Sequence, residues 1–112
     1  STPEATAFDL LHYVHGAGGL GNAATVLAEL REAIRPRQLV SVAKAEDEPV
    51  CAQRLGYLLD LAGGRKQTGP LAKWLAKRKT LPAPLRPGRP IQNFPLNRRW
   101  QVIVNEQVEP DL

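Results

Sequence analysis

The sequence predicts an α+β fold that is predominantly helical: about five helices, then a proline-rich extended segment and a C-terminal β-strand or short hairpin. Three observations support this prediction. Apolar residues recur at helical spacing through most of the first 79 residues. Five prolines then fall between positions 82 and 95, where they rule out a helix and restrict any strand to a sheet edge. Finally, residues 99–105 have the aromatic and β-branched composition of a strand.

The first two helices are delimited by residues typical of helix ends. Thr2 is a hydroxyl N-cap, followed by Pro3 and by Glu4 in the first turn. The apolar face of this helix is Ala7, Leu10, Leu11 and Val14, and we expect the glycines of residues 16–19 to end it. A second helix is predicted over residues 20–34. Its apolar stripe is Leu20, Ala23, Ala24, Leu27, Leu30 and Ile34.

Prolines and glycines delimit the next three helices. Pro36 is predicted to start a short helix that continues through Leu39, Val40 and Ala43. Asp47 is the predicted N-cap of a fourth helix, which the glycine pair 63–64 ends. The buried face expected for this fourth helix is Cys51, Leu55, Leu58, Leu59 and Ala62. Thr68 is predicted to open the fifth, whose apolar side is Leu71, Trp74, Leu75 and Arg78.

The remaining residues are predicted to be extended. We expect residues 81–96 to lie across the helices, and Trp100, Val102 and Val104 to share one face of the strand that follows. A single strand cannot satisfy its own backbone groups. Its partner is either the proline-rich segment or a strand outside this chain. Because the chain opens at an N-cap, without an initiator Met, we favour the second option and expect a longer parent protein.

Size and composition limit the class of protein. The 112 residues are 43% hydrophobic and 23% charged, so we expect residues 1–112 to form a single domain with one core. Cys51 is the only cysteine, which excludes a disulfide scaffold and a cysteine-based zinc site. No apolar stretch approaches the ~20 residues that span a bilayer, and no signal segment opens the chain. We therefore expect a cytoplasmic protein without membrane partners.

Charge is distributed unevenly. Residues 1–60 carry five bases and eight acids, whereas residues 61–105 carry ten bases and no acid. Such a block can steer an anionic partner, or it can be a solvated face that balances acids elsewhere. The candidate partner or phosphate contacts are Arg65, Lys66, Lys73, Lys77, Arg78 and Lys79. Lys73 and Lys77 lie one helical turn apart, with Lys66 within reach of the same face.

We find no catalytic or cofactor-binding motif. His12 and His15 lie three apart, with Asp9 one turn earlier, but two histidines cannot complete a metal site and no carboxylate pair accompanies them. We expect them to be exposed or hydrogen-bonded, and Cys51 to be a buried small hydrophobe. The glycine-rich residues 16–21 lack the lysine and hydroxyl of a P-loop. The chain is therefore predicted to be neither an enzyme nor a cofactor-binding protein.

Four segments in series resemble the C-terminal domain of the AbiEi antitoxin family. Residues 1–10 read STPEATAFDL, residues 18–20 read GGL and are followed by Asn22, and residues 24–30 read ATVLAEL. Residues 53–59 read QRLGYLL, and the pattern closes with RW at 99–100 and VEPDL at 108–112. The resemblance covers nearly the whole chain, with residues 65–94 as the divergent part.

The resemblance implies a bacterial toxin–antitoxin role in abortive infection and phage defence. Full-length members of this family carry an N-terminal winged-helix domain that binds the promoter of their own operon and supports transcriptional autoregulation. Their C-terminal domain neutralises a cognate AbiEii-type nucleotidyltransferase toxin. Neutralisation by direct binding, by an effect on the toxin's target or by promoting toxin modification all remain open. The family supplies no catalytic residue.

Five polar residues are candidates for a structural network. Asp9 and Arg54 either pair across the edge of the core or are both exposed, and the sequence favours neither alternative. Asn22 is placed to bond to the turn at residues 16–19. Asn105 and Glu109 follow the predicted strand and are placed to hold the C-terminus.

The leading hypothesis is therefore an antitoxin module that binds a protein partner. One alternative is a nucleic-acid-binding module in which residues 61–105 contact phosphates, and steep salt dependence would distinguish it. Another is a structural domain that dimerises or positions a DNA-binding part.

Overall fold

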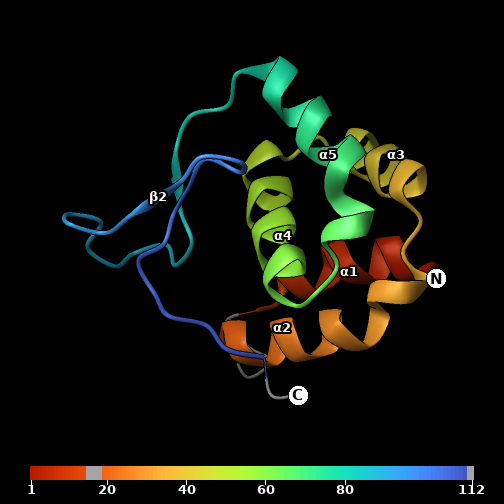
Figure 1. Ribbon diagram of the computed structural model, residues 1–112, viewed down its shortest axis with the longest axis horizontal. Helices are drawn as coiled ribbons and strands as arrows, with labels where there is room; N and C mark the ends of the chain where they lie inside the picture. Colours follow the sequence, from red (N-terminus) through yellow and green to blue (C-terminus); the bar gives the residue numbers. More distant parts are fainter. Residues whose placement is uncertain (15–18, 111–112) are drawn as a thin grey trace.

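The computed structural model describes residues 1–14 and 19–110 (Figure 1). Five α-helices occupy the first 78 residues, and a 3-10 turn η1 (Arg31–Ala33) follows the second of them. The helices are α1 (Pro3–His12), α2 (Gly19–Leu30), α3 (Pro36–Glu46), α4 (Pro49–Leu61) and α5 (Arg65–Arg78). Short strands follow: β1 (Ala83–Pro84), β2 (Leu96–Asn97) and β3 (Val102–Ile103). The predicted α+β fold with predominant helix is confirmed.

Several predicted helix boundaries are confirmed. Thr2 is the N-cap of α1, and its hydroxyl oxygen accepts from the Ala5 amide at 3.1 Å. Pro36 starts α3. Gly63 follows the C-terminal end of α4 and has a positive φ of 93°, a conformation that favours glycine. α1 ends at His12, with Tyr13 as its C-cap, so it stops before the glycines of residues 16–19 that were expected to end it. Residues 15–18 lie outside the described residues.

Asp47 was expected to cap the start of the fourth helix, and this prediction is wrong. Asp47 instead ends α3 in the left-handed region, at a φ of 52°, and its amide donates to the Ala43 carbonyl at 3.0 Å. Aspartate tolerates this conformation better than most residues. Glu48 takes the N-cap position of α4 without a side-chain capping bond.

The start of α5 is also earlier than predicted. The helix begins at Arg65 and contains Thr68 and Pro70. Thr68 does not cap it, because its buried hydroxyl donates to Asp60 Oδ1 at 2.6 Å. Pro70 lies in the second turn. Because proline has no N–H, the carbonyl of the exposed residue Lys66 lacks its usual helical hydrogen bond. The second helix likewise ends early, at Leu30, and a 3-10 turn leads to Ile34 in extended conformation before Arg35-Pro36.

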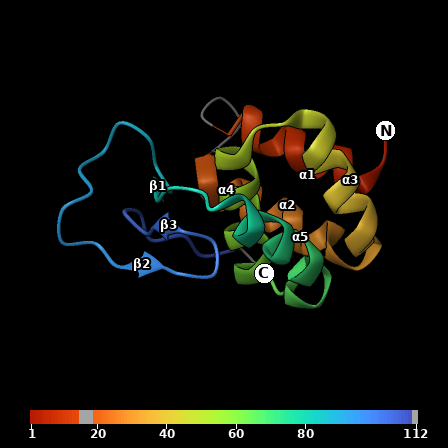
Figure 2. The ribbon, with the colours of Figure 1, turned by 90° about the horizontal axis from the view of Figure 1, so that it is seen from above.

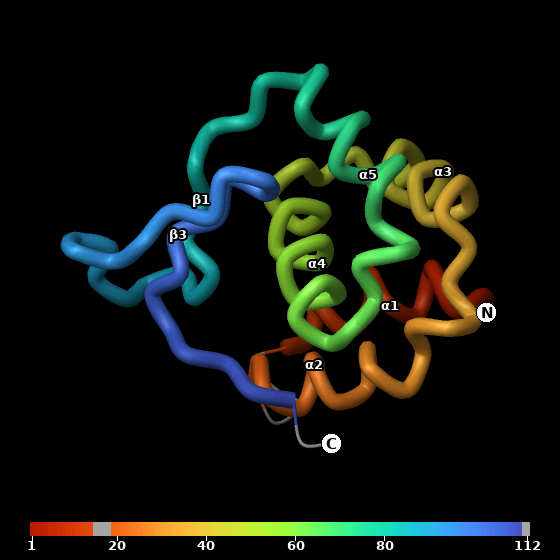
Figure 3. The backbone as a smooth tube through the Cα atoms, in the orientation of Figure 1, coloured from red at the N-terminus to blue at the C-terminus, as the bar shows by residue number. Residues whose placement is uncertain are grey.

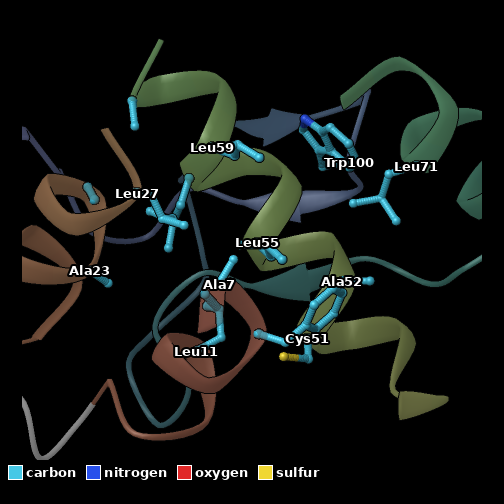
Figure 4. Packing of buried hydrophobic residues seen from close by; sticks show 14 of the residues in the cluster. Ala7, Leu11, Ala23, Leu27, Cys51, Ala52, Leu55, Leu59, Leu71 and Trp100 are labelled. Atoms are coloured by element: carbon cyan, nitrogen blue, oxygen red, sulfur yellow. The ribbon is translucent and has the colours of Figure 1, made fainter. Parts of the chain in front are cut away.

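The core is built around α4, which packs against α1, α2 and α5 (Figures 1 and 4). The whole predicted inner face of this helix is buried, which confirms that prediction. In Figure 4, Leu27 and Ala7 lie on one side of α4, and Leu71 and Trp100 on the other. Phe8, which the predicted apolar stripe of the first helix omitted, is fully buried.

The three strands form a small sheet in the order β1-β3-β2 (Figures 2 and 3). β1 is parallel to β3 with Ala83 opposite Val102, and β2 is antiparallel to β3 with Leu96 opposite Ile103. The proline-rich segment therefore supplies both partners of the last strand, and the expectation of a partner outside the chain is wrong. Pro84 is tolerated because β1 is an edge strand.

The strand is shorter than predicted and the proline-rich segment lies elsewhere. Gln101 has a φ of 54°, which ends the extended conformation just before Val102. Residues 87–96 are exposed, and Figure 2 shows this stretch projecting away from the helices rather than lying across them. The segment has to run beside β3 to satisfy its backbone, and this places it on one side of the helical body.

Trp100 and Gln53 join the sheet to α4. The indole of Trp100 is 1% exposed, and a Cβ atom on Gly56 would overlap its ring. The buried Gln53 amide lies within 3.0–3.1 Å of the carbonyls of Leu81, Trp100 and Gln101. The chain after β3 runs back toward the start of α2 (Figure 3). No helix in the described residues is long and apolar enough to cross a membrane.

Candidate functional site

α3 and α5 pack side by side (Figures 1 and 2). Side chains from both helices line a basic groove between them. Its volume is about 420 Å³. The α3 residues that line it are Arg37, Val40, Ser41 and Lys44, and the α5 residues are Pro70, Lys73, Trp74 and Lys77. Helical periodicity explains the alignment, because side chains three, four or seven positions apart share one face. We call this feature the basic groove.

The groove combines positive charge with an aromatic floor. Four of its lining side chains are cationic and none is acidic. Trp74 is half-buried, and the Arg78 guanidinium lies 4.9 Å from its ring centroid. Cations beside an indole can bind carboxylates or phosphates while the ring supplies apolar contact.

The structure separates the six predicted contact residues. Lys73 and Lys77 line the basic groove, whereas Lys66 and Lys79 are exposed outside it. Arg65 lies 3.6 Å from Asp60 Oδ2 and Arg78 lies 3.4 Å from Asp47 Oδ1, so both have acidic neighbours.

Arg37 and Lys44 are groove residues that the sequence argument missed. They come from a part of the chain with an acidic balance and lie outside the basic block. Their spacing of seven was the available signal, since it puts two cations on the same face of one helix. Nothing local to α3 indicated that this face lies next to α5.

The rest of the basic block is spread over other surfaces. Lys79, Arg98 and Arg99 line a separate pocket of about 250 Å³ beside Trp100. Arg86 pairs with Glu106 at 3.1 Å. The ten bases therefore do not form a single positive face, because the turns after α5 distribute them around the sheet.

Asp60 is the centre of a polar cluster that was not predicted. Its Oδ2 atom accepts from Trp100 Nε1 at 2.8 Å and from Arg99 Nε at 3.0 Å. Its Oδ1 atom accepts from the Thr68 hydroxyl at 2.6 Å. The Asp60 side chain is only 15% exposed. One carboxylate thus connects the end of α4, the first part of α5 and residues 99–100, which lie shortly before β3.

The proposed Asp9–Arg54 pair does not form. Asp9 is exposed, and no ion pair between the described residues joins it to Arg54. Arg54 Nε instead donates to the Pro84 carbonyl at 2.8 Å, because the packing of β1 beside α4 supplies a closer acceptor. Burial lowers the pKa of the Arg54 guanidinium.

Asn105 holds the proline-rich segment in place. Its Oδ1 atom accepts from the Arg86 amide at 2.8 Å, and its Nδ2 donates to the Arg86 carbonyl at 2.9 Å. Glu109 is exposed, and only its backbone approaches Gly21 at the start of α2. Asn22 is also exposed, and the turn it was expected to contact lies largely outside the described residues. Arg54 and Asn105 therefore each bind backbone groups of residues 84–86, through separate hydrogen bonds.

A second cluster lies where α1 meets the start of α4. His12 Nε2 lies 3.0 Å from Glu48 Oε2, which agrees with the predicted hydrogen-bonded histidine. Cys51 is buried, as predicted. Burial raises the pKa of the Cys51 thiol to about 12, and the Glu48 and Glu46 carboxylates add to the rise, so the thiol is neutral at pH 7. His15 lies outside the described residues.

These observations define a helical α+β protein that carries a basic groove between two adjacent helices. The chain belongs to the AbiEi antitoxin family, because the family model of the AbiEi antitoxin C-terminal domain matches residues 1–61. The matched residues run from α1 to the end of α4 and include one wall of the groove. No curated protein and no solved structure matches the chain significantly.

Family membership implies an antitoxin role in a toxin–antitoxin system of the abortive-infection type, with a toxin as partner. It also favours a non-enzymatic role. α5, which supplies the second wall of the groove, and the sheet lie beyond the matched residues.

Proposed function

We propose that this domain counteracts a cognate AbiEii-type nucleotidyltransferase toxin and that the basic groove binds an acidic surface of that toxin. The observation that carries the proposal is the convergence of four cations from α3 and α5 around Trp74, with no acid among the lining residues. Complementary charge accelerates association, and a partly buried aromatic supplies contact area at the centre of an interface.

The groove residues are available to a partner. Lys73 and Lys77 are exposed and form no ion pair with any residue in the described ranges. A lysine at such a position keeps its charged end in water while its stem covers apolar surface. An acidic surface can therefore bind these two lysines without first breaking a salt bridge to another described residue.

The test is growth rescue by this chain in cells that express the neighbouring toxin gene. Lys73→Glu with Lys77→Glu should weaken partner binding by about tenfold or more, because two like-charge contacts replace two attractive ones. Rescue should fall accordingly, while the melting temperature stays nearly constant because both side chains are exposed.

The matched control is Lys66→Glu with Arg89→Glu. It changes the net charge by the same amount at two exposed sites outside the groove, and rescue should persist. Equal loss of rescue in both double variants would mean that total charge matters and the groove does not. Unchanged rescue in the Lys73/Lys77 variant would refute the role of the groove.

A nucleic-acid partner is the second candidate, and Trp74 among cations is the observation that favours it. Bases stack on aromatic side chains, and phosphates bind lysine and arginine. For each tenfold rise in salt concentration, the affinity for single-stranded RNA would then fall by about 0.7 logarithmic units per phosphate contact. A steep slope with RNA and no co-purified toxin would favour this candidate over the acidic protein surface.

We further propose that the full-length protein represses its own promoter through an N-terminal winged-helix domain. Similarity to the AbiEi family supports this proposal. DNA binding should then require that domain and be absent from residues 1–112 alone, which a mobility-shift assay with promoter DNA measures.

A further inference from the structure

Three different metal-ligating side chains meet away from the basic groove. His12 is the last residue of α1, Glu48 is the N-cap of α4, and Cys51 lies in the first turn of α4. One imidazole nitrogen, one carboxylate oxygen and the thiol sulfur all lie within 4.8 Å of one another. The histidine reaches this point from 36 positions earlier in the chain, so tertiary packing assembles the cluster.

Open space borders these donor atoms. A pocket of about 480 Å³ is lined by Leu11, His12, Glu48, Pro49, Val50, Cys51 and Arg54. In Figure 4 the Cys51 sulfur points toward α1 beside Leu11. A pocket of this size accommodates an ion together with water, because one water occupies about 30 Å³. His12 and Glu48 are exposed beside this pocket, and the buried Cys51 also lines it.

The local charge favours a cation. Glu48 Oε2 lies 3.0 Å and Glu46 Oε2 lies 3.9 Å from His12 Nε2, so two carboxylates face one imidazole. Arg54 also borders the pocket and opposes this charge, but its Nε donates to the Pro84 carbonyl on the β1 side. Two carboxylates against one guanidinium leave a negative balance, which a divalent ion would neutralise.

We propose that His12, Glu48 and Cys51 bind one zinc ion, with water in the fourth position. This proposal departs from the expectation, based on the sequence, that one cysteine and two histidines cannot provide a zinc site, because the fold adds Glu48 to the ligand set. Zinc accepts this mixture of nitrogen, oxygen and sulfur ligands, and three protein ligands with one water is a common arrangement. Magnesium and calcium prefer oxygen ligands alone. The thiol loses its proton to solvent when sulfur binds the ion.

Zinc at this point would connect the end of α1 to the turn between α3 and α4. Because the unfolded chain does not hold the three ligands together, binding favours the folded state. This site is distinct from the basic groove, since the two share no lining residue. The proposal therefore does not depend on the toxin or nucleic-acid partner.

The test uses metal-free protein titrated with cobalt(II), whose bond to a thiolate produces a charge-transfer absorption band, and then with zinc. We expect one equivalent of cobalt to produce the band, zinc to abolish it, and zinc but not magnesium to raise the melting temperature. Cys51→Ala should abolish the band. Glu48→Gln and His12→Gln should each weaken zinc binding by about tenfold or more, as measured with a chelating dye.

Asp9→Asn is the matched control, since Asp9 is an exposed carboxylate on the same helix as His12. Its zinc affinity should equal that of the unchanged protein. Absence of the cobalt band in the unchanged protein, or zinc binding of equal strength in Cys51→Ala, would overturn the proposal. Far-UV circular dichroism checks that each variant is folded, and His12→Gln changes an exposed side chain, so a folded variant remains available.

Discussion

At the scale of single residues, Gly56 determines how closely the sheet approaches α4. A methyl group at this position would overlap the Trp100 ring. We expect Gly56→Ala to destabilise the protein by about 1–3 kcal/mol, because overpacking a closed contact shifts side chains or backbone. Thermal or denaturant unfolding measures this change in the free energy of unfolding.

Gly21→Ala is the control for this prediction. Gly21 is also helical, and the nearest atom to an added Cβ would be the Glu109 carbonyl oxygen at 4.0 Å. Alanine there should be neutral or should stabilise by up to about 1 kcal/mol, because glycine is the poorer helix former. If Gly56→Ala and Gly21→Ala were equally stable, the Trp100 ring would accommodate the added methyl group without loss of stability, which would contradict the prediction.

At the scale of elements, Asp60 connects three parts of the chain. Asp60→Asn keeps the shape of the side chain but replaces one acceptor oxygen with a donor. The NH₂ group then faces either the N–H donors of Trp100 and Arg99 or the Thr68 hydroxyl, and in both orientations the negative charge beside Arg99 is lost. We expect a loss of about 2–3 kcal/mol in the free energy of unfolding, because partly buried donors lose their charged acceptor.

Asp47→Asn is the comparison. Asp47 forms an ion pair with Arg78 at 3.4 Å, but its side chain is 72% exposed. Asparagine also tolerates the left-handed conformation at this position. The expected change is within about 0.5 kcal/mol, as for most exposed ion pairs. A cost for Asp60→Asn as small as this would contradict the role assigned to the Asp60 cluster.

At the scale of the whole molecule, we predict that the helices and the sheet unfold together as one domain. Trp100, Gln53 and Asp60 join the two parts through buried contacts. In a Trp74→Phe variant, Trp100 is the only tryptophan, so its fluorescence reports on the sheet side while far-UV circular dichroism reports on the helices. The two melting curves should coincide. Loss of the Trp100 signal at lower temperature would show two separate folding units.

Much of the helical architecture could be predicted from the sequence because the relevant forces are local. Thr2, Pro36 and Gly63 delimit helices through the conformations that these residue types favour, independently of distant contacts. The face of α4 that includes Leu55 and Leu59 follows from the helical period of 3.6 residues, which specifies which side chains must be buried together.

Long-range packing decided the rest of the fold. Pro84 and Leu96 lie in strands only because β3 lies between them, and this pairing joins residues up to 19 positions apart. Threonine is favoured at helix N-caps, yet Thr68 lies inside α5, where its hydroxyl donates to Asp60. In both cases a tertiary partner satisfies polar groups that local rules leave unassigned.

The candidate sites show the same division. Helical spacing in the sequence was enough to place Lys73 and Lys77 on one helix face, and the residue pattern was enough to indicate the antitoxin family. The packing of the helices was needed to show that Arg37 and Lys44 complete the basic groove, and that His12 meets Cys51 at the start of α4. The physical reason is that helix periodicity orients side chains within one helix, whereas the packing of separate helices depends on the complete core.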